Sequence, residues 1–150
     1  MKKALIVAGI VVAVAVVAWA QTWHPTNQAT VGWDAVTTMT NEDGTVEPLP
    51  EGDTITYKAH VIREANIGNP DAAILLGETS DTQYVITLPD EGRWFVGVSA
   101  VRIHPVEGEE PIVTESEISW SSVAEVTNND PFGFAMFYMP TQPSGLRPVE

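Results

Sequence analysis

Residues 88–101 decide the fold of this chain, and they read Leu-Pro-Asp-Glu-Gly-Arg-Trp-Phe-Val-Gly-Val-Ser-Ala-Val. Residues 89–92 are predicted as a turn, because proline, aspartate and glycine favour chain reversal. Residues 93–103 alternate and are rich in branched and aromatic types, which predicts the longest strand of the protein. Side chains two residues apart share one face of a strand, so we expect an inward set of Trp94, Val96, Val98 and Ala100.

Shorter runs of the same kind lie on both sides of this segment. Turn residues separate them, and no stretch after residue 20 repeats apolar residues at helical spacing. Residues 37–53 and 105–111 read as polar loops. Strands are predicted over 29–36, 54–63, 73–77, 82–88 and 117–126. This pattern predicts an all-β protein, an immunoglobulin-like antiparallel β-sandwich of about seven strands.

Length and composition limit the classes of function. A chain of 150 residues suits one globular domain. Its 20 acidic and 7 basic residues give a net charge of −13, which repels phosphate backbones and excludes nucleic-acid binding. The chain has no cysteine, so disulfides, thiolate nucleophiles and cysteine-bound zinc are excluded as well.

The first twenty residues have the layout of an export signal. Lys2 and Lys3 precede an uncharged apolar stretch over 4–20, and Ala18-Trp19-Ala20 offers a small-x-small cleavage site. The alternative is a retained hydrophobic helix that anchors the chain in a membrane through residues 4–20. Under both interpretations the rest of the chain is exported, to the outer side of the cytoplasmic membrane. Residues 21–28 are then predicted as a short lead-in or first strand.

Four landmarks occur in a fixed order along the rest of the chain. They are Trp33 in TVGWDAV, Tyr57 in ITYKAHV, the Leu-Pro turn and strand of residues 88–101, and the serine-rich segment 115–121. In this order they resemble the fibronectin type III family over about residues 29–126, and most of all its small single-domain versions from bacteria and phages. The resemblance implies a structural core that includes Trp33, Tyr57, Leu88, Trp94, Val96, Val98 and Ala100.

One landmark departs from the family pattern. The family usually has tyrosine where this chain has Trp94, and the tyrosine hydroxyl bonds back to a main-chain group at a corner between two strands. An indole N–H is only a donor and sits elsewhere on the ring. The resemblance therefore does not by itself predict that bond here.

Chemistry-bearing residues form only one weak constellation. Asn41, Asp43 and Glu47 gather oxygen ligands around a glycine, as calcium prefers, but the full loop pattern fails at Met39 and Pro50. The three histidines have no ligand spacing, and no Gly-x-Ser-x-Gly elbow occurs. The sequence predicts a protein without catalysis or cofactor.

The C-terminal segment 127–150 is apolar and then rich in proline. Its aromatic run either folds back onto the domain or docks on a partner, including a second copy of the chain. Trp120 on the last predicted strand either packs on the core or stacks on a sugar. The candidate partner contacts are therefore Trp120, Phe132, Phe134, Phe137 and Tyr138.

Together these observations predict an exported or membrane-anchored module for protein–protein or surface binding and adhesion. Two alternatives stay open. One is a structural subunit of a larger envelope or phage-type particle, and the other is a carbohydrate-binding accessory domain that recognises a surface glycan.

Overall fold

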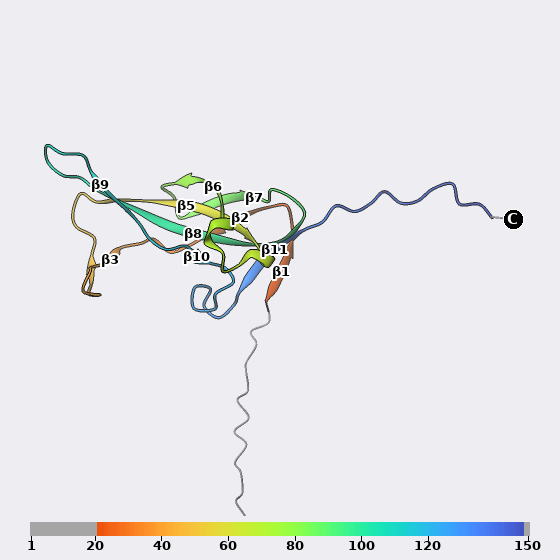
Figure 1. Ribbon diagram of the computed structural model, residues 1–150, viewed down its shortest axis with the longest axis horizontal. Helices are drawn as coiled ribbons and strands as arrows, with labels where there is room; N and C mark the ends of the chain where they lie inside the picture. Colours follow the sequence, from red (N-terminus) through yellow and green to blue (C-terminus); the bar gives the residue numbers. More distant parts are fainter. Residues whose placement is uncertain (1–20, 149–150) are drawn as a thin grey trace, which may run out of the picture.

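The computed structural model describes residues 21–148, and they form an all-β arrangement in three sheets (Figure 1). The strands are β1 (Thr22–Pro25), β2 (Gln28–Gly32), β3 (Thr38–Thr40), β4 (Val46–Pro48), β5 (Thr54–Arg63), β6 (Ile74–Thr79), β7 (Gln83–Thr87), β8 (Gly92–His104), β9 (Ile112–Glu115), β10 (Ser119–Trp120) and β11 (Phe132–Met136). Two short 3-10 helices, η1 (Glu64–Asn66) and η2 (Pro70–Ala72), lie between β5 and β6. The all-β prediction is confirmed.

The long strand β8 organises the largest sheet. This sheet has the order β1-β11-β8-β5-β6, and β9 and β10 also pair with β8. All pairs in it are antiparallel except β1 with β11, which run parallel. The remaining strands form two antiparallel ribbons, β2–β7 and β3–β4.

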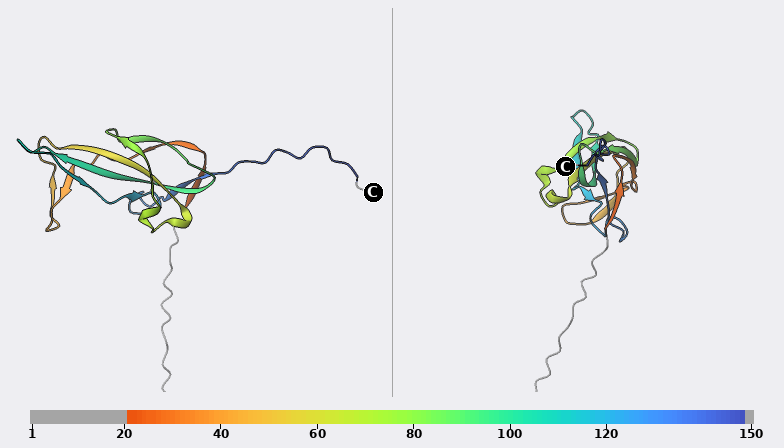
Figure 2. Two further views of the ribbon diagram at one scale, coloured as in Figure 1. Left: turned by 45° about the horizontal axis from the view of Figure 1, so that its top comes forward. Right: turned by 90° about the vertical axis from the view of Figure 1, so that its right-hand side faces the viewer.

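The main core lies between the large sheet and the β2–β7 ribbon, which form two layers (Figure 2). Alternation along each strand directs one set of side chains into this space. The buried set is Val31, Val61, Ile86, Leu88, Trp94, Val96, Phe134 and Met136. Tyr57 is also buried, but Val98 and Ala100 are only half-buried.

The opposite face of the large sheet is covered too, which the sequence did not predict. Phe95 and Ser99 point to this outer face and are buried. Two tryptophan rings lie over glycines there: a Cβ at Gly133 would come within 2.5 Å of the Trp23 ring, and one at Gly97 within 2.5 Å of the Trp120 ring. Aromatic rings over strand glycines replace the missing side-chain contacts and seal the sheet.

The turn before β8 is fastened by Trp94. Its indole N–H donates a 3.0 Å hydrogen bond to the main-chain oxygen of Asp90. The Arg63 guanidinium carbon lies 4.5 Å from the centre of the indole, and Nη1 of Arg63 donates to the main-chain oxygen of Glu91 at 2.8 Å. An indole N–H therefore makes a main-chain hydrogen bond at this turn, where the sequence alone did not predict one.

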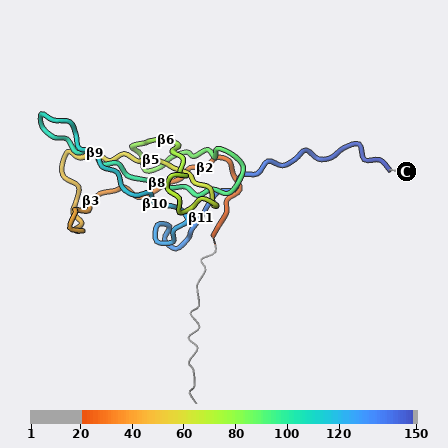
Figure 3. Tube along the Cα trace, viewed as in Figure 1, coloured from red at the N-terminus to blue at the C-terminus, as the bar shows by residue number. Residues whose placement is uncertain are grey.

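The β3–β4 hairpin and the β8–β9 loop lie at the end of the body away from the C-terminal tail (Figure 3). Residues 37–53, predicted as an irregular loop, contain the β3–β4 hairpin, whose turn has Gly44 at φ +83°. The acidic loop 105–111 is followed by β9 rather than by more loop. The strand predicted over 117–126 shortens to β10, because residues 121–130 form successive turns.

The structure describes the two ends of the chain to different extents. The predicted signal or hydrophobic helix over 1–20 lies outside the described residues. Within residues 21–148, no helix has the length and apolar character needed to cross a membrane. At the other end, β11 is folded into the sheet, whereas residues 137–148 run away from the body as an extended segment (Figures 1 and 2).

Candidate binding groove

The structure places Trp33 at the edge of the core and not at its centre. It follows the last residue of β2 and is half-buried, with its ring 5.4 Å from that of Tyr57 in an edge-on arrangement. The Tyr57 hydroxyl accepts a 2.9 Å hydrogen bond from the main-chain N–H of Val36. Trp33 thus contacts the core from one side and leaves its other side near solvent.

Two of the three calcium candidates, Asn41 and Asp43, meet at the hydroxyl of Thr45. Asp43 Oδ1 accepts hydrogen bonds from the N–H and hydroxyl of Thr45, at 2.9 and 2.6 Å, and these bonds lower the pKa of Asp43. Asn41 donates to the same threonine hydroxyl, and Glu47 lies on β4 opposite Met39. The side chains of Asn41 and Asp43 thus bond within the hairpin, and within residues 21–148 no three His, Asp or Glu side chains group as metal ligands.

A chain of polar side chains runs across the outer face of β5 and β8. Ser99 is fully buried and its hydroxyl donates to Glu115 Oε1 at 2.7 Å, while His60 Nε2 lies 3.2 Å from the same hydroxyl. Lys58 pairs with Glu115 Oε2 at 2.6 Å. The carboxylate here contacts the hydroxyl and not the imidazole, so the order differs from that of a nucleophile–base–acid triad.

A second polar cluster ties β5 to β8 near the hairpin end of the body. The Asp53 side chain is completely buried; its Oδ1 lies 2.6 Å from His104 Nδ1, and its Oδ2 accepts from Arg102 Nε. The hydrogen bond with His104, assisted by Arg102, lowers the pKa of Asp53. This cluster holds a buried charge with partners for both oxygens, as a buried carboxylate requires.

Within residues 21–148, the outer edge of β2 has no neighbouring strand. The main-chain N–H of Trp33 donates to the main-chain oxygen of Thr82, and the main-chain N–H of Leu88 donates to that of Asn27. The main-chain groups of the odd-numbered residues in this segment therefore face β7. In an antiparallel pair the alternate residues face away. The main-chain N–H and C=O groups of Thr30 and Gly32 therefore point to the open edge, where both residues are exposed.

Two adjoining pockets open along this edge, and we call them together the β2 groove. They have volumes of about 380 and about 330 Å³ and share Val31, Gly32 and Phe132 in their linings. The groove lies at the seam between the two layers, because β1 pairs with β11 and leaves the position next to β2 free.

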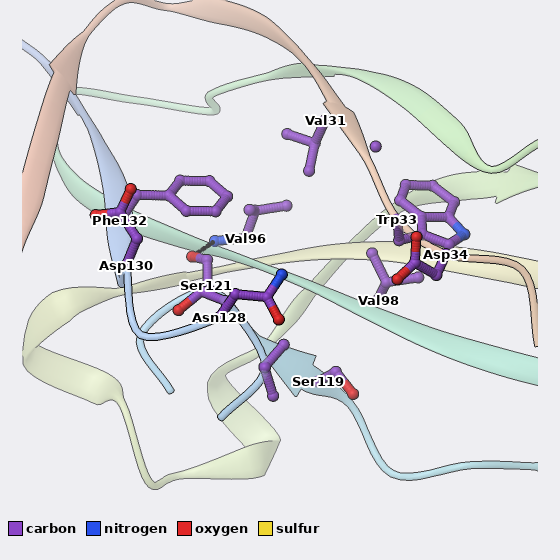
Figure 4. A pocket seen from close by; sticks show the side chains of 13 residues that line it. Val31, Trp33, Asp34, Val96, Val98, Ser119, Ser121, Asn128, Asp130 and Phe132 are labelled. Carbon is purple, nitrogen blue, oxygen red and sulfur yellow. Dashed lines mark hydrogen bonds between the residues drawn. The ribbon is translucent and has the colours of Figure 1, made fainter. Parts of the chain in front are cut away.

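The larger pocket combines an apolar floor with a polar rim (Figure 4). Val96 and Val98 from β8 lie beneath it. Trp33 and Asp34 lie at one end and Asp130 and Phe132 at the other, with Asn128 between them. Ser121 is buried, and its hydroxyl accepts the N–H of Val96 at 3.1 Å.

Trp33 adds an unusual feature to this rim. Its indole N–H is buried and has no hydrogen-bond partner within the described residues. A buried donor without a partner is costly, and such groups in native proteins call for an explanation. The indole therefore has capacity for one further acceptor.

The five candidate partner contacts separate into two groups. Phe134 is 6% exposed and belongs to the core, Trp120 packs on Gly97, and Phe132 is half-buried in the wall of the β2 groove. In contrast, Phe137 and Tyr138 are 65% and 71% exposed on the tail. The aromatic run thus folds back as far as residue 136 and projects after it.

Sequence reasoning did not find the β2 groove. Its signal was indirect: the lead-in 21–28 contains one short strand, and in the structure that strand pairs with β11 and not with β2. Which of the two it joins depends on contacts between residues about 110 positions apart in the chain, for which a single sequence holds no local pattern.

Comparisons of the chain with family models, with curated proteins and with solved structures find no match.

Proposed function

We propose that this chain is a non-catalytic, exported binding module of the fibronectin type III type. The layer arrangement supports this assignment, because a β2–β7 ribbon faces a sheet centred on β8, as in two-layer immunoglobulin-like folds. The bond from Trp94 to Asp90 supports it as well, since it fastens the corner that a tyrosine fastens in that architecture. Export rests on the leader-like residues 1–20.

The observation that carries a binding function is the open edge of β2 beside an apolar groove. Unpaired main-chain groups on an exposed strand bind extended peptides by adding a strand to the sheet. Thr30 and Gly32 offer the main-chain groups, and the floor of Val31, Val96 and Phe132 offers space for alternate side chains. The partner is therefore an extended segment of a polypeptide.

Selection of peptides from a random display library on the protein, in the form in which the cell exports it, tests this function. Enriched peptides are then titrated against Thr30→Pro, which removes the outward N–H but no bond to β7. Thr30→Val is the matched control, because it keeps the N–H and the branched Cβ. We expect the proline variant to bind about tenfold or more weakly, a loss of about 1.4 kcal/mol, and the valine variant to bind normally.

Amide hydrogen exchange gives a second measurement that needs no variant. Bound peptide should slow exchange at Thr30 and Gly32, whereas the odd-numbered amides of β2 are protected already. Enriched peptides that leave both exchange rates unchanged would show that the β2 edge is not the binding site.

A glycan is the second candidate ligand, favoured by the half-buried ring of Trp33 and by the nearby side chains of Asp34 and Asn128. Aromatic rings with adjacent polar groups bind sugars through stacking and hydrogen bonds. A glycan array with Trp33→Ala and Trp120→Ala distinguishes this candidate. Trp33→Ala alone should abolish any signal from the groove, since Trp120 lies on the outer face of the sheet.

A further inference from the structure

We infer that the β2 groove of one copy accepts the C-terminal tail of a second copy, residues 137–141, as an added strand. This inference rests on the proposed function of the groove and names its occupant. The contact would join two different surfaces, an edge on one molecule and a tail on the next. Such head-to-tail contacts generate chains or rings, depending on whether the rotation between copies closes.

Within residues 21–148 no strand pairs with the tail, although the main-chain N–H of Tyr138 donates a hydrogen bond to Glu91 Oε1. Residues 137–148 are exposed and extended, with Met139 at 93% exposure beside Phe137 and Tyr138. An exposed apolar run of this kind is unusual on a monomer and marks a contact with another surface. The tail leaves the far end of β11 and points away from its own body (Figure 2).

The prolines of the tail fit this pairing. If Phe137, Met139 and Thr141 direct their main-chain groups to the acceptor, then Pro140 falls on the outward side, where its missing N–H is not needed. The next proline, Pro143, would face the acceptor strand and stop the pairing. Six residues, 137–142, precede that stop, and the last of them to face the acceptor is Thr141, so the pairing spans residues 137–141, the same length as β2.

Charge also favours the tail as the occupant. The chain as a whole carries a net charge of −13, but the side chains of residues 137–150 are neutral in sum, with one arginine, Arg147, and one acid, Glu150. The groove has Asp34 and Asp130 on its rim. The tail is therefore a segment that can approach this acidic edge without repulsion, and a parallel orientation would carry Arg147 towards the Asp34 end.

Sedimentation of the full chain over a wide range of concentration tests this inference. We expect association that grows with concentration, and monomers only for a chain that ends at Met136. Thr30→Pro should lower the association constant about tenfold or more, and Thr30→Val should leave it unchanged. A full chain that stays monomeric throughout, or association that persists in the shortened chain, overturns the inference.

A synthetic peptide of residues 137–148 separates this inference from the proposed function. Added to the chain that ends at Met136, it should bind and slow amide exchange at Thr30 and Gly32, while melting curves confirm that the shortened chain is folded. If library peptides bind the groove and the tail peptide does not, the inference fails and the proposed function stands. If neither binds, both fail.

Discussion

The indole N–H of Trp94 and the main-chain oxygen of Asp90 form a 3.0 Å hydrogen bond that closes the turn leading into β8. The ring is 2% exposed, and the Arg63 guanidinium covers one face of it. A single side chain thus fills the core between the layers and holds the corner from which the longest strand begins. This combination explains why a large aromatic residue with a donor stands at position 94.

Replacement of Trp94 separates these two roles. Trp94→Phe keeps an aromatic ring but removes the donor and leaves the Asp90 oxygen unpaired, so we expect a loss of about 2–4 kcal/mol in the free energy of unfolding. Trp94→Tyr supplies a hydroxyl that can bond to the corner and should lose less. Urea denaturation measures both, and equal losses would show that the hydrogen bond contributes little.

Gly97 is predicted to resist substitution because Trp120 lies over it. A Cβ at this position would come within 2.5 Å of both the Trp120 ring and Ile118 Cγ2. We expect Gly97→Ala to cost about 1–3 kcal/mol through overpacking, measured by thermal unfolding. Gly32→Ala is the control, since its Cβ would meet only the Thr82 oxygen at 3.6 Å. A neutral Gly97→Ala would mean that Trp120 moves freely.

His60 should make stability depend on pH near neutrality. Burial lowers the pKa of His60 in the folded protein below its ordinary value of 6.5, although Glu115 opposes the shift. The unfolded chain therefore takes up a proton first, and stability falls as the pH drops below about 6.5. His60→Gln should reduce the difference in the free energy of unfolding between pH 8 and pH 5. His24→Gln, at an exposed position, should leave that difference intact.

Asp53 should contribute stability that disappears in acid. Its hydrogen bond with His104, and then Arg102, lowers its pKa below 3.8 in the folded state. The contribution is present above that pH and is lost as the pH falls through the lowered pKa. Asp53→Asn should therefore lower the Tm at pH 7, and the difference in Tm between this variant and the parent protein should become smaller on acidification. Asp71→Asn, at an exposed position on η2, should have the same Tm as the parent protein at pH 7 and in acid.

Two truncations should divide the C-terminal segment into a folded and a dispensable part. Removal of residues 131–150 deletes β11, which pairs with β1 and β8 and buries Phe134 and Met136. We expect loss of cooperative unfolding by circular dichroism. Removal of residues 137–150 spares these contacts and should leave the Tm unchanged. An unchanged Tm after the longer deletion would contradict the position of β11 in the sheet.

Strands with a strong local pattern could be predicted from the sequence. The segment 54–63 coincides with β5, and the segments predicted over 82–88 and 93–103 match β7 and β8 to within a residue at each end. Their alternation reflects burial along the strand itself. The short strands β3, β4 and β9 were missed, because each has three or four residues and forms only through its partner, whereas β1 lies in the segment 21–28 where a short first strand was expected.

The β2 groove could not be predicted from the sequence for a related reason. Trp33 was expected within the second strand, whereas it stands just beyond β2, at the mouth of the pocket that the free edge creates. The half-burial of Val98 and Ala100 likewise depends on how far the β2–β7 ribbon extends over β8. Both depend on packing between layers.

Period-two alternation, turn residues and the absence of helical spacing were enough to specify an all-β chain, because they act between residues a few positions apart. The tertiary structure alone decided that β1 joins β11, that the aromatic run 132–136 lies inside the sheet, and that β2 keeps an open edge. Which strands pair depends on the relative free energies of competing long-range pairings, and these free energies are set only when the layers pack together.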